Sequence, residues 1–199
     1  MATRGIFGFR KNGEDKLTYN HCDSYPDGLG RNIIEFINKH SVEELNDTFD
    51  KIVLVNEHTP PTEKQIQICI KNGLSDFSVS SGQKTDWYCL LRNCQGDLES
   101  LVSMEDEAYM IDNRDFIKDS LFCEYGYIIN LDDNVLEYWE GFQYEPDPDN
   151  RYGTEHYGEY EDMFYPCKLI HTFSFDQLDD VDTIIELMNE EENDEIIGF

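Results

Sequence analysis

The densest group of side chains that could do chemistry lies in residues 19–26, the run YNHCDSYP. Four consecutive residues in it carry an imidazole, a thiol, a carboxylate and a hydroxyl, which are the groups of a nucleophilic active site. Neighbouring residues of a strand point to opposite faces, however, so these side chains cannot meet as a triad within one strand. The structural alternative is that Asn20, Asp23 and Ser24 satisfy backbone groups at a turn while the flanking tyrosines pack.

An enzyme that uses this segment would be a hydrolase of a small amide or of a nucleotide-derived molecule. An arginine near a strand end could hold an anionic substrate through two parallel hydrogen bonds. The candidate pocket residues are Thr3, Arg4, Asn20, His21 and Asp23. A further alternative is a protein that binds a small signalling molecule without cleaving it.

A β-hairpin is predicted to position this segment. Residues 3–9 are rich in strand formers, and Asn12 and Gly13 supply the chemistry of a tight turn. Residues 16–21 can run back beside the first strand. The polar run at 24–28 then ends the second strand.

Apolar periodicity and capping signals predict the other elements. Helices are expected over residues 33–40, 41–49, 62–71, 86–93, 98–104 and 175–190, with N-caps at Ser41 (in a capping box with Glu44), Thr62 and Asp176. Strands are expected over residues 51–55, 121–131, 135–142 and 168–175, the middle two forming a second hairpin. A long exposed loop is expected over residues 145–161, and a frayed tail over residues 190–199.

These elements predict one α+β domain over residues 1–199. Its antiparallel sheet or sheets would be built from the N-terminal and central hairpins and packed by helices. Few Gly or Ser linkers separate the elements, and no internal repeat is visible. The chain is long enough to bury a substantial core.

Charge is divided unevenly along the chain. Residues 1–96 hold 11 Lys and Arg against 13 Asp and Glu, whereas residues 97–199 hold 4 against 30. Nearly all of the net charge of −28 therefore belongs to the second part. Such a field repels nucleic-acid phosphates and attracts basic surfaces. The composition argues against direct binding of nucleic acid and favours a partner protein with a basic, nucleic-acid-binding surface.

The acidic part could imitate nucleic acid. Carboxylates carried on strands and rigid loops can reproduce the charge of a phosphate backbone, and tyrosines between them can anchor the contact. The expected partner-binding residues are Asp132, Asp133, Glu137, Glu140, Glu145, Asp147, Asp149, Glu155, Glu159, Glu161 and Asp162. The alternative is an acidic surface that contacts only water and maintains solubility.

Metal and cofactor sites are not expected. The five histidines are scattered, and the acidic runs at 132–134 and 147–150 lack the spacing of a calcium-binding loop. The six cysteines form no C-x-x-C pair, which is typical of free, mostly buried thiols in a reducing cytoplasm. No apolar run approaches the roughly 18 residues needed to cross a bilayer, so no membrane contact is expected.

The opening of the chain carries a family resemblance. Residues 3–30, TRGIFGFRKNGEDKLTYNHCDSYPDGLG, resemble the opening of small, uncharacterised proteins encoded by bacteriophages and prophages of low-GC bacteria. The later run IINLDDNVLEYWEG is similar to a hairpin of the same group. The resemblance implies a viral protein acting in the host bacterial cytoplasm. With the acidic half, it leads us to expect a stoichiometric inhibitor of a nucleic-acid-handling or anti-phage defence complex, with anti-CRISPR action as one form.

A fainter resemblance concerns the first hairpin. A strand, a turn and a returning strand with Asn20 and Asp23 resemble N-terminal-nucleophile hydrolases of the choloylglycine hydrolase type, in which a terminal Cys faces an Asn and an Asp. The resemblance implies an αββα scaffold. Position 2 is Ala2, and removal of Met1 would leave Ala2 rather than Thr3 at the terminus. Because that chemistry needs a terminal nucleophile, the departure argues against catalysis by this route.

Overall fold

The first hairpin forms one edge of the central sheet in the computed structural model, which describes residues 3–105, 107–157 and 164–196. Strands β1 (Gly5–Lys11) and β2 (Glu14–Asn20) pair antiparallel, as the sequence predicts. Asn12 and Gly13 connect them with φ angles of 54° and 73°. Left-handed backbone at both positions matches the twist of the flanking strands, which explains why this turn uses Asn and Gly.

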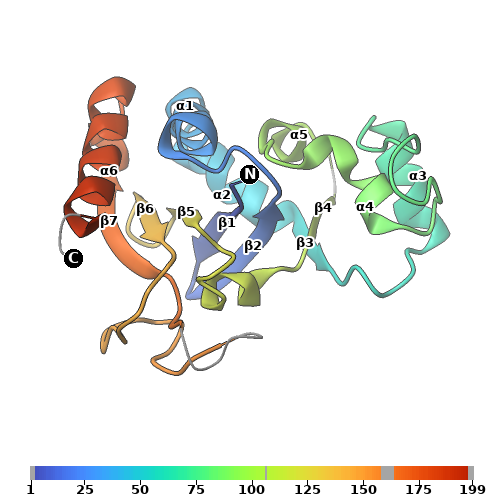
Figure 1. The fold of residues 1–199 in the computed structure, drawn as a ribbon. Coiled ribbons are helices and arrows are strands. Elements are labelled where there is room, and N and C mark those ends of the chain that lie inside the picture. Colours follow the sequence, from blue (N-terminus) through green and yellow to red (C-terminus); the bar gives the residue numbers. More distant parts are fainter. Residues whose placement is uncertain (1–2, 106, 158–163, 197–199) are drawn as a thin grey trace.

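The predicted central hairpin lies beside the first one. It consists of β5 (Tyr125–Asn130) and β6 (Val135–Glu140), and β7 (Lys168–Ser174) completes the five-stranded sheet. The strand order is β2-β1-β5-β6-β7 (Figure 1). Neighbours are antiparallel except for β1 and β5, which run parallel and thereby join the two hairpins.

A small second sheet lies beyond β2. It pairs the predicted strand β3 (Ile52–Val55) in parallel with β4 (Ala108–Ile111), which the sequence analysis missed. Four residues are too few to reveal a strand by alternation. Asn113, just after β4, connects the small sheet to the main sheet, because its N–H donates to the carbonyl of Leu17 on β2 at 3.1 Å.

The described residues form six α-helices, most of them close to their predicted positions. They are α1 (Arg31–Lys39), α2 (Val42–Lys51), α3 (Glu63–Lys71), α4 (Trp87–Leu90), α5 (Glu99–Val102) and α6 (Val181–Ile196). Short helical turns lie at Pro26–Gly30, Arg92–Cys94, Arg114–Lys118 and Phe175–Gln177. Capping boxes from Ser41 and Thr62 start α2 and α3, which confirms both predicted N-caps.

The last helix differs from its prediction. It begins at Val181 rather than near Asp176, because Ser174 caps a separate 3-10 turn first. Asp180 then accepts hydrogen bonds from the Thr183 N–H and hydroxyl and caps α6. The helix is assigned to Ile196, where a frayed tail was expected over residues 190–199, and residues 197–199 lie outside the described part.

The sheet is covered differently on its two faces. Helices α1, α2 and α6 lie over one face, whereas the long loop after β6 and the turn at Arg114–Lys118 lie over the other (Figure 1). One hydrophobic cluster runs from Phe7 on β1 through Trp87 on α4 to Met188 on α6. The protein is therefore a single α+β domain, as predicted. The described residues contain one large sheet, so the stacked sheets of the αββα alternative are not formed.

Candidate functional site

The segment after β2 is held by internal hydrogen bonds. The buried Asn20 amide donates to the Cys22 carbonyl at 2.6 Å and to the Ser24 hydroxyl at 2.8 Å. The Ser24 N–H in turn donates to the carbonyl of buried Thr3 at 3.4 Å. Asn20 and Ser24 therefore satisfy groups at a turn, which supports the structural interpretation of this run.

Each of the other candidate pocket residues, including Asp23 in the same turn, makes contacts of its own. Asp23 is exposed with a φ of 56°, and its carbonyl accepts from Leu29 where the chain enters α1. Arg4 places its guanidinium over the Phe122 ring at 4.6 Å. Of the five expected pocket residues, only His21 lines the cavity between the two sheets.

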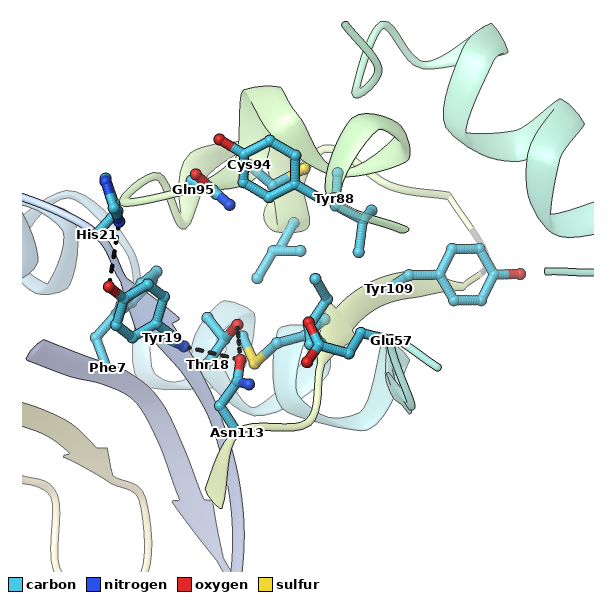
Figure 2. A pocket seen from close by; sticks show the side chains of 14 residues that line it. Phe7, Thr18, Tyr19, His21, Glu57, Tyr88, Cys94, Gln95, Tyr109 and Asn113 are labelled. Atoms are coloured by element: carbon cyan, nitrogen blue, oxygen red, sulfur yellow. Dashed lines mark hydrogen bonds between the residues drawn. The ribbon is translucent and has the colours of Figure 1, made fainter. Parts of the chain in front are cut away.

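This cavity has a volume of about 180 Å³ and lies between β2, β4, α4 and α5. Its apolar lining includes Phe7, Leu91, Leu101, Met110 and Ile111, and its polar lining includes Thr18, Tyr19, His21, Glu57, Tyr88, Cys94, Gln95 and Asn113. Figure 2 shows Tyr19 and His21 at one end, the Tyr88 ring on the upper side, and Glu57 and Asn113 below. Only Tyr19 and His21 were expected from the sequence, because the other lining residues are scattered over separate segments between residues 7 and 113.

Hydrogen bonds fix the strand side of the cavity. The Asn113 Oδ1 accepts from the Tyr19 N–H at 3.1 Å and from the Thr18 hydroxyl at 3.3 Å (Figure 2). This pairing leaves the Asn113 Nδ2 group free to donate to a ligand. The Tyr19 hydroxyl lies 3.1 Å from His21 Nδ1, and burial raises the pKa of Tyr19, so its phenol stays protonated at neutral pH.

Two of the expected partner-binding residues are inside the protein. Glu137 is 3% exposed and Glu140 is 7% exposed. Both lie on β6, a central strand covered by helices on one face and by the long loop on the other. Glu140 accepts from the Tyr138 hydroxyl at 2.5 Å, and burial, followed by the Glu140 charge, raises the pKa of Tyr138. The prediction that these two carboxylates meet a partner is therefore wrong.

Glu137 belongs to an ionic network that holds the long loop on the sheet. Arg151 donates to both of its carboxylate oxygens, at 2.8 and 2.6 Å. Arg151 also donates to the Tyr152 hydroxyl, which donates to Asp15 on β2 at 3.0 Å. Burial alone would lower the pKa of Arg151, but the hydrogen bonds and charges of Glu137 and Tyr152 together outweigh it, and the pKa rises. Arg151 is thus a permanent cation that balances a buried carboxylate.

The aromatic residues of the acidic part are also mostly internal. Tyr125, Tyr127, Tyr138 and Trp139 are buried in the sheet and cannot anchor a partner, contrary to expectation. Tyr144 and Tyr157 in the loop are 61% and 40% exposed. Of these six, Tyr144 and Tyr157 are available for a contact; the other expected anchors are Tyr152 and Tyr165, which are half-buried, and Tyr160, which lies outside the described residues.

The remaining expected carboxylates lie at the surface where they are described. Asp133, Glu145, Asp149 and Glu155 are exposed, and Asp147 is half-buried. Glu159, Glu161 and Asp162 lie outside the described residues. The sequence analysis overlooked another exposed acidic run beside them, Asp176, Asp179, Asp180, Asp182 and Glu186 at the start of α6.

Asp132 is exposed and has a structural role as well. Its carboxylate accepts from the Asn12 N–H at 2.6 Å and from the Gly13 N–H at 3.0 Å. The Gly13 and Asn12 hydrogen bonds lower the pKa of Asp132. The turn of the central hairpin therefore clamps the turn of the first hairpin.

The described residues contain no group of three or more His, Cys, Asp or Glu side chains that could hold a metal ion. Within the same residues, no helix is long and apolar enough to cross a membrane. All six cysteines are free thiols, and Cys69, Cys89, Cys123 and Cys167 are buried. Comparison with family models, curated proteins and solved structures finds no match for the chain.

Proposed function

We propose that this protein binds a basic surface of a nucleic-acid-handling protein through exposed carboxylates and blocks that surface stoichiometrically. The observation that carries the proposal is a group of acidic residues where the β5–β6 turn meets the start of α6. The Phe175 N–H donates to the Asn134 carbonyl at 3.0 Å and joins the two segments. The turn-end carboxylates, as we call the group, are Asp132, Asp133, Asp176, Asp179 and Asp180, all exposed.

The turn-end carboxylates lack neutralising partners. Among the described ion pairs, none involves Asp133, Asp176, Asp179 or Asp180. Two of the four cations of residues 97–199, Arg114 and Lys118, bind the nearby Asp112 and Asp115, and Arg151 binds buried Glu137. These exposed, unpaired carboxylates contribute to the net charge of −28 and can steer a basic partner.

The backbone that carries the group is well held. The Asn130 Oδ1 accepts from the N–H groups of Asp132 and Asp133, at 3.0 and 3.3 Å. Asp132 is fixed in turn by the first hairpin. A partner would therefore meet carboxylates whose positions are already set, so little ordering entropy is lost on binding.

The more specific part of the proposal is the kind of protein that would be bound. The resemblance of residues 3–30 to phage-encoded proteins supports a host nucleic-acid-handling or anti-phage defence complex, in the host bacterial cytoplasm. Mimicry of nucleic acid requires that the protein displace DNA or RNA from its target rather than bind nucleic acid itself. A surface kept acidic for solubility alone would displace nothing.

The test is a capture from bacterial lysate followed by competition. The captured partner should be a nucleic-acid-binding protein, its association rate should fall steeply as salt rises, and the acidic protein should displace its DNA or RNA. An association rate independent of salt, or a ternary complex with the nucleic acid still bound, would contradict the proposal.

Three charge-removing variants locate the binding surface, and the first and the control remove three charges each. Asp133→Asn, Asp176→Asn and Asp179→Asn together should weaken binding at least tenfold. A second set measures how much the loop after β6 contributes to the binding affinity: Asp147→Asn, Asp149→Asn, Glu159→Gln and Glu161→Gln. The control set Asp27→Asn, Glu35→Gln and Asp47→Asn removes three exposed charges from the near-neutral half and should leave affinity within a factor of two.

A further inference from the structure

We propose that the cavity between β2, β4, α4 and α5 is a binding site for a small, uncharged nitrogen heterocycle with an exocyclic amine, of which the free base cytosine is the simplest match. The site is separate from the turn-end carboxylates, and the inference does not depend on the proposed function. It rests on the size of the cavity, its lining and the charges around it.

Size restricts the ligand to about one ring. The cavity measures about 180 Å³, and an engineered protein cavity of about 150 Å³ holds one benzene molecule. Drug-sized ligands occupy pockets of about 300 Å³ or more. Phe7 and Leu101 of the lining are buried, whereas Glu57 and His21 are exposed and Tyr88 is 37% exposed, so the cavity opens to solvent beside these three residues.

The polar lining offers an acceptor, Glu57, and two amide donors, Asn113 and Gln95. Glu57 extends a carboxylate that can only accept, and in the described structure its one ion-pair partner is exposed His58 at 3.6 Å. The Asn113 Nδ2 is free to donate, as described above. Gln95 accepts from Arg92 through Oε1 at 2.6 Å, which leaves its Nε2 group to donate. A ligand amine that faces Glu57 would donate to its carboxylate. A ring nitrogen or carbonyl that faces Asn113 and Gln95 would accept from their amide groups.

The charges that line the cavity disfavour a phosphate on the ligand, although the Arg92 guanidinium lies behind the lining, where it donates to Gln95. None of the 14 lining residues is Lys or Arg, and the one fixed charge among them is the Glu57 carboxylate. The whole protein adds a net charge of −28. A nucleotide would bring its anion toward like charge, whereas a free base would not. The Tyr88 ring lies on the upper side of the cavity (Figure 2), and aromatic rings are groups on which a base can stack.

The test is isothermal titration of the full chain with cytosine, uracil and cytidine 5′-monophosphate. Cytosine and uracil have nearly the same size but differ in the amine that faces Glu57. Cytosine should bind about tenfold more tightly than uracil, and the monophosphate should bind more weakly than cytosine. Equal affinity for the two bases, tighter binding of the monophosphate, or no binding of cytosine would each overturn the proposal.

Two variants assign the contacts. Glu57→Gln can donate as well as accept, so it should bring the affinities for cytosine and uracil to within about threefold of each other. Tyr88→Ala should weaken both bases. The controls Glu145→Gln and Tyr144→Ala change the same residue types at exposed positions outside the cavity and should change neither affinity. Because all four positions are exposed, folding is expected to be retained, and a control that matched its partner variant would refute the site.

Discussion

Glu137 and Asp133 lie four residues apart on the same hairpin, yet their carboxylates are in opposite environments. Glu137 is buried on β6 and paired with Arg151, whereas Asp133 is exposed at the turn and has no ion pair among the described residues. The acidic part of the chain thus contains an internal network that stabilises the fold and an outer surface that is free for a partner. Substitutions in the two regions should separate stability from binding.

The largest effect is expected from breaking the internal network. Arg151→Ala leaves the Glu137 charge buried without its cation, so the free energy of unfolding should fall by about 3 kcal/mol. Chemical denaturation at neutral pH measures the change. Lys118→Ala removes an exposed ion pair with Asp115 and should cost less than 1 kcal/mol. Equal costs for the two variants would contradict the difference between internal and outer pairs.

An intermediate effect is expected at the clamp between the two hairpin turns. Asp132→Asn weakens two charge-assisted hydrogen bonds, to Asn12 and Gly13, and should cost about 1 kcal/mol because the site is exposed. The pKa of Asp132 is lowered in the folded state, so this stabilisation is present above the unfolded pKa near 4 and is lost as pH falls through the folded pKa.

Denaturation at several pH values tests the clamp. The wild-type protein and Asp132→Asn should differ at pH 7 and converge below about pH 4. A difference that persists unchanged in acid would show that the hydrogen bonds do not depend on the charge of Asp132. Glu155→Gln, at an exposed loop position, serves as the control and should show no such convergence.

Salt should stabilise the whole protein modestly. The outer carboxylates repel one another in the compact state, and added ions screen that repulsion. Raising sodium chloride from low to moderate concentration should raise the melting temperature by about 2–4 °C, the shift that corresponds to about 1 kcal/mol in a chain of this size. A melting temperature that falls over this range would contradict the prediction.

The smallest effect on stability is expected from the turn-end carboxylates. The triple variant Asp133→Asn, Asp176→Asn and Asp179→Asn removes exposed, unpaired charges, so the free energy of unfolding should change by less than about 0.5 kcal/mol per substitution. A stabilisation would agree with relief of repulsion. A loss as large as that of Arg151→Ala would place these residues with the internal network instead.

Local sequence signals predicted much of the fold. Asn12 and Gly13 determine the first turn through the left-handed backbone that it requires, and the Ser41 and Thr62 capping boxes mark the starts of two helices. The same signals were ambiguous at the last helix, where both Ser174 and Asp180 can cap a turn. Short-range hydrogen bonding explains both the successes and this error.

The candidate sites were predicted less well. Of the residues that line the cavity, only Tyr19 and His21 were part of a predicted site. No sequence motif marks Glu57, Tyr88, Gln95 or Asn113. Two of the turn-end carboxylates, Asp132 and Asp133, were expected to bind a partner. The three that follow β7 were not. Both sites bring together residues that are distant in the chain.

The sequence by itself determined the hairpins, most helices and the concentration of negative charge after residue 96, because these depend on neighbours a few positions apart. Tertiary structure alone decided which carboxylates face solvent. The parallel pairing of β1 with β5 joins segments about 120 residues apart, and the pairing of β7 with β6 makes β6 an inner strand, covered on both faces. Glu137 and Glu140 are buried for that reason, whereas Asp133, at the turn beyond the end of the sheet, remains in water.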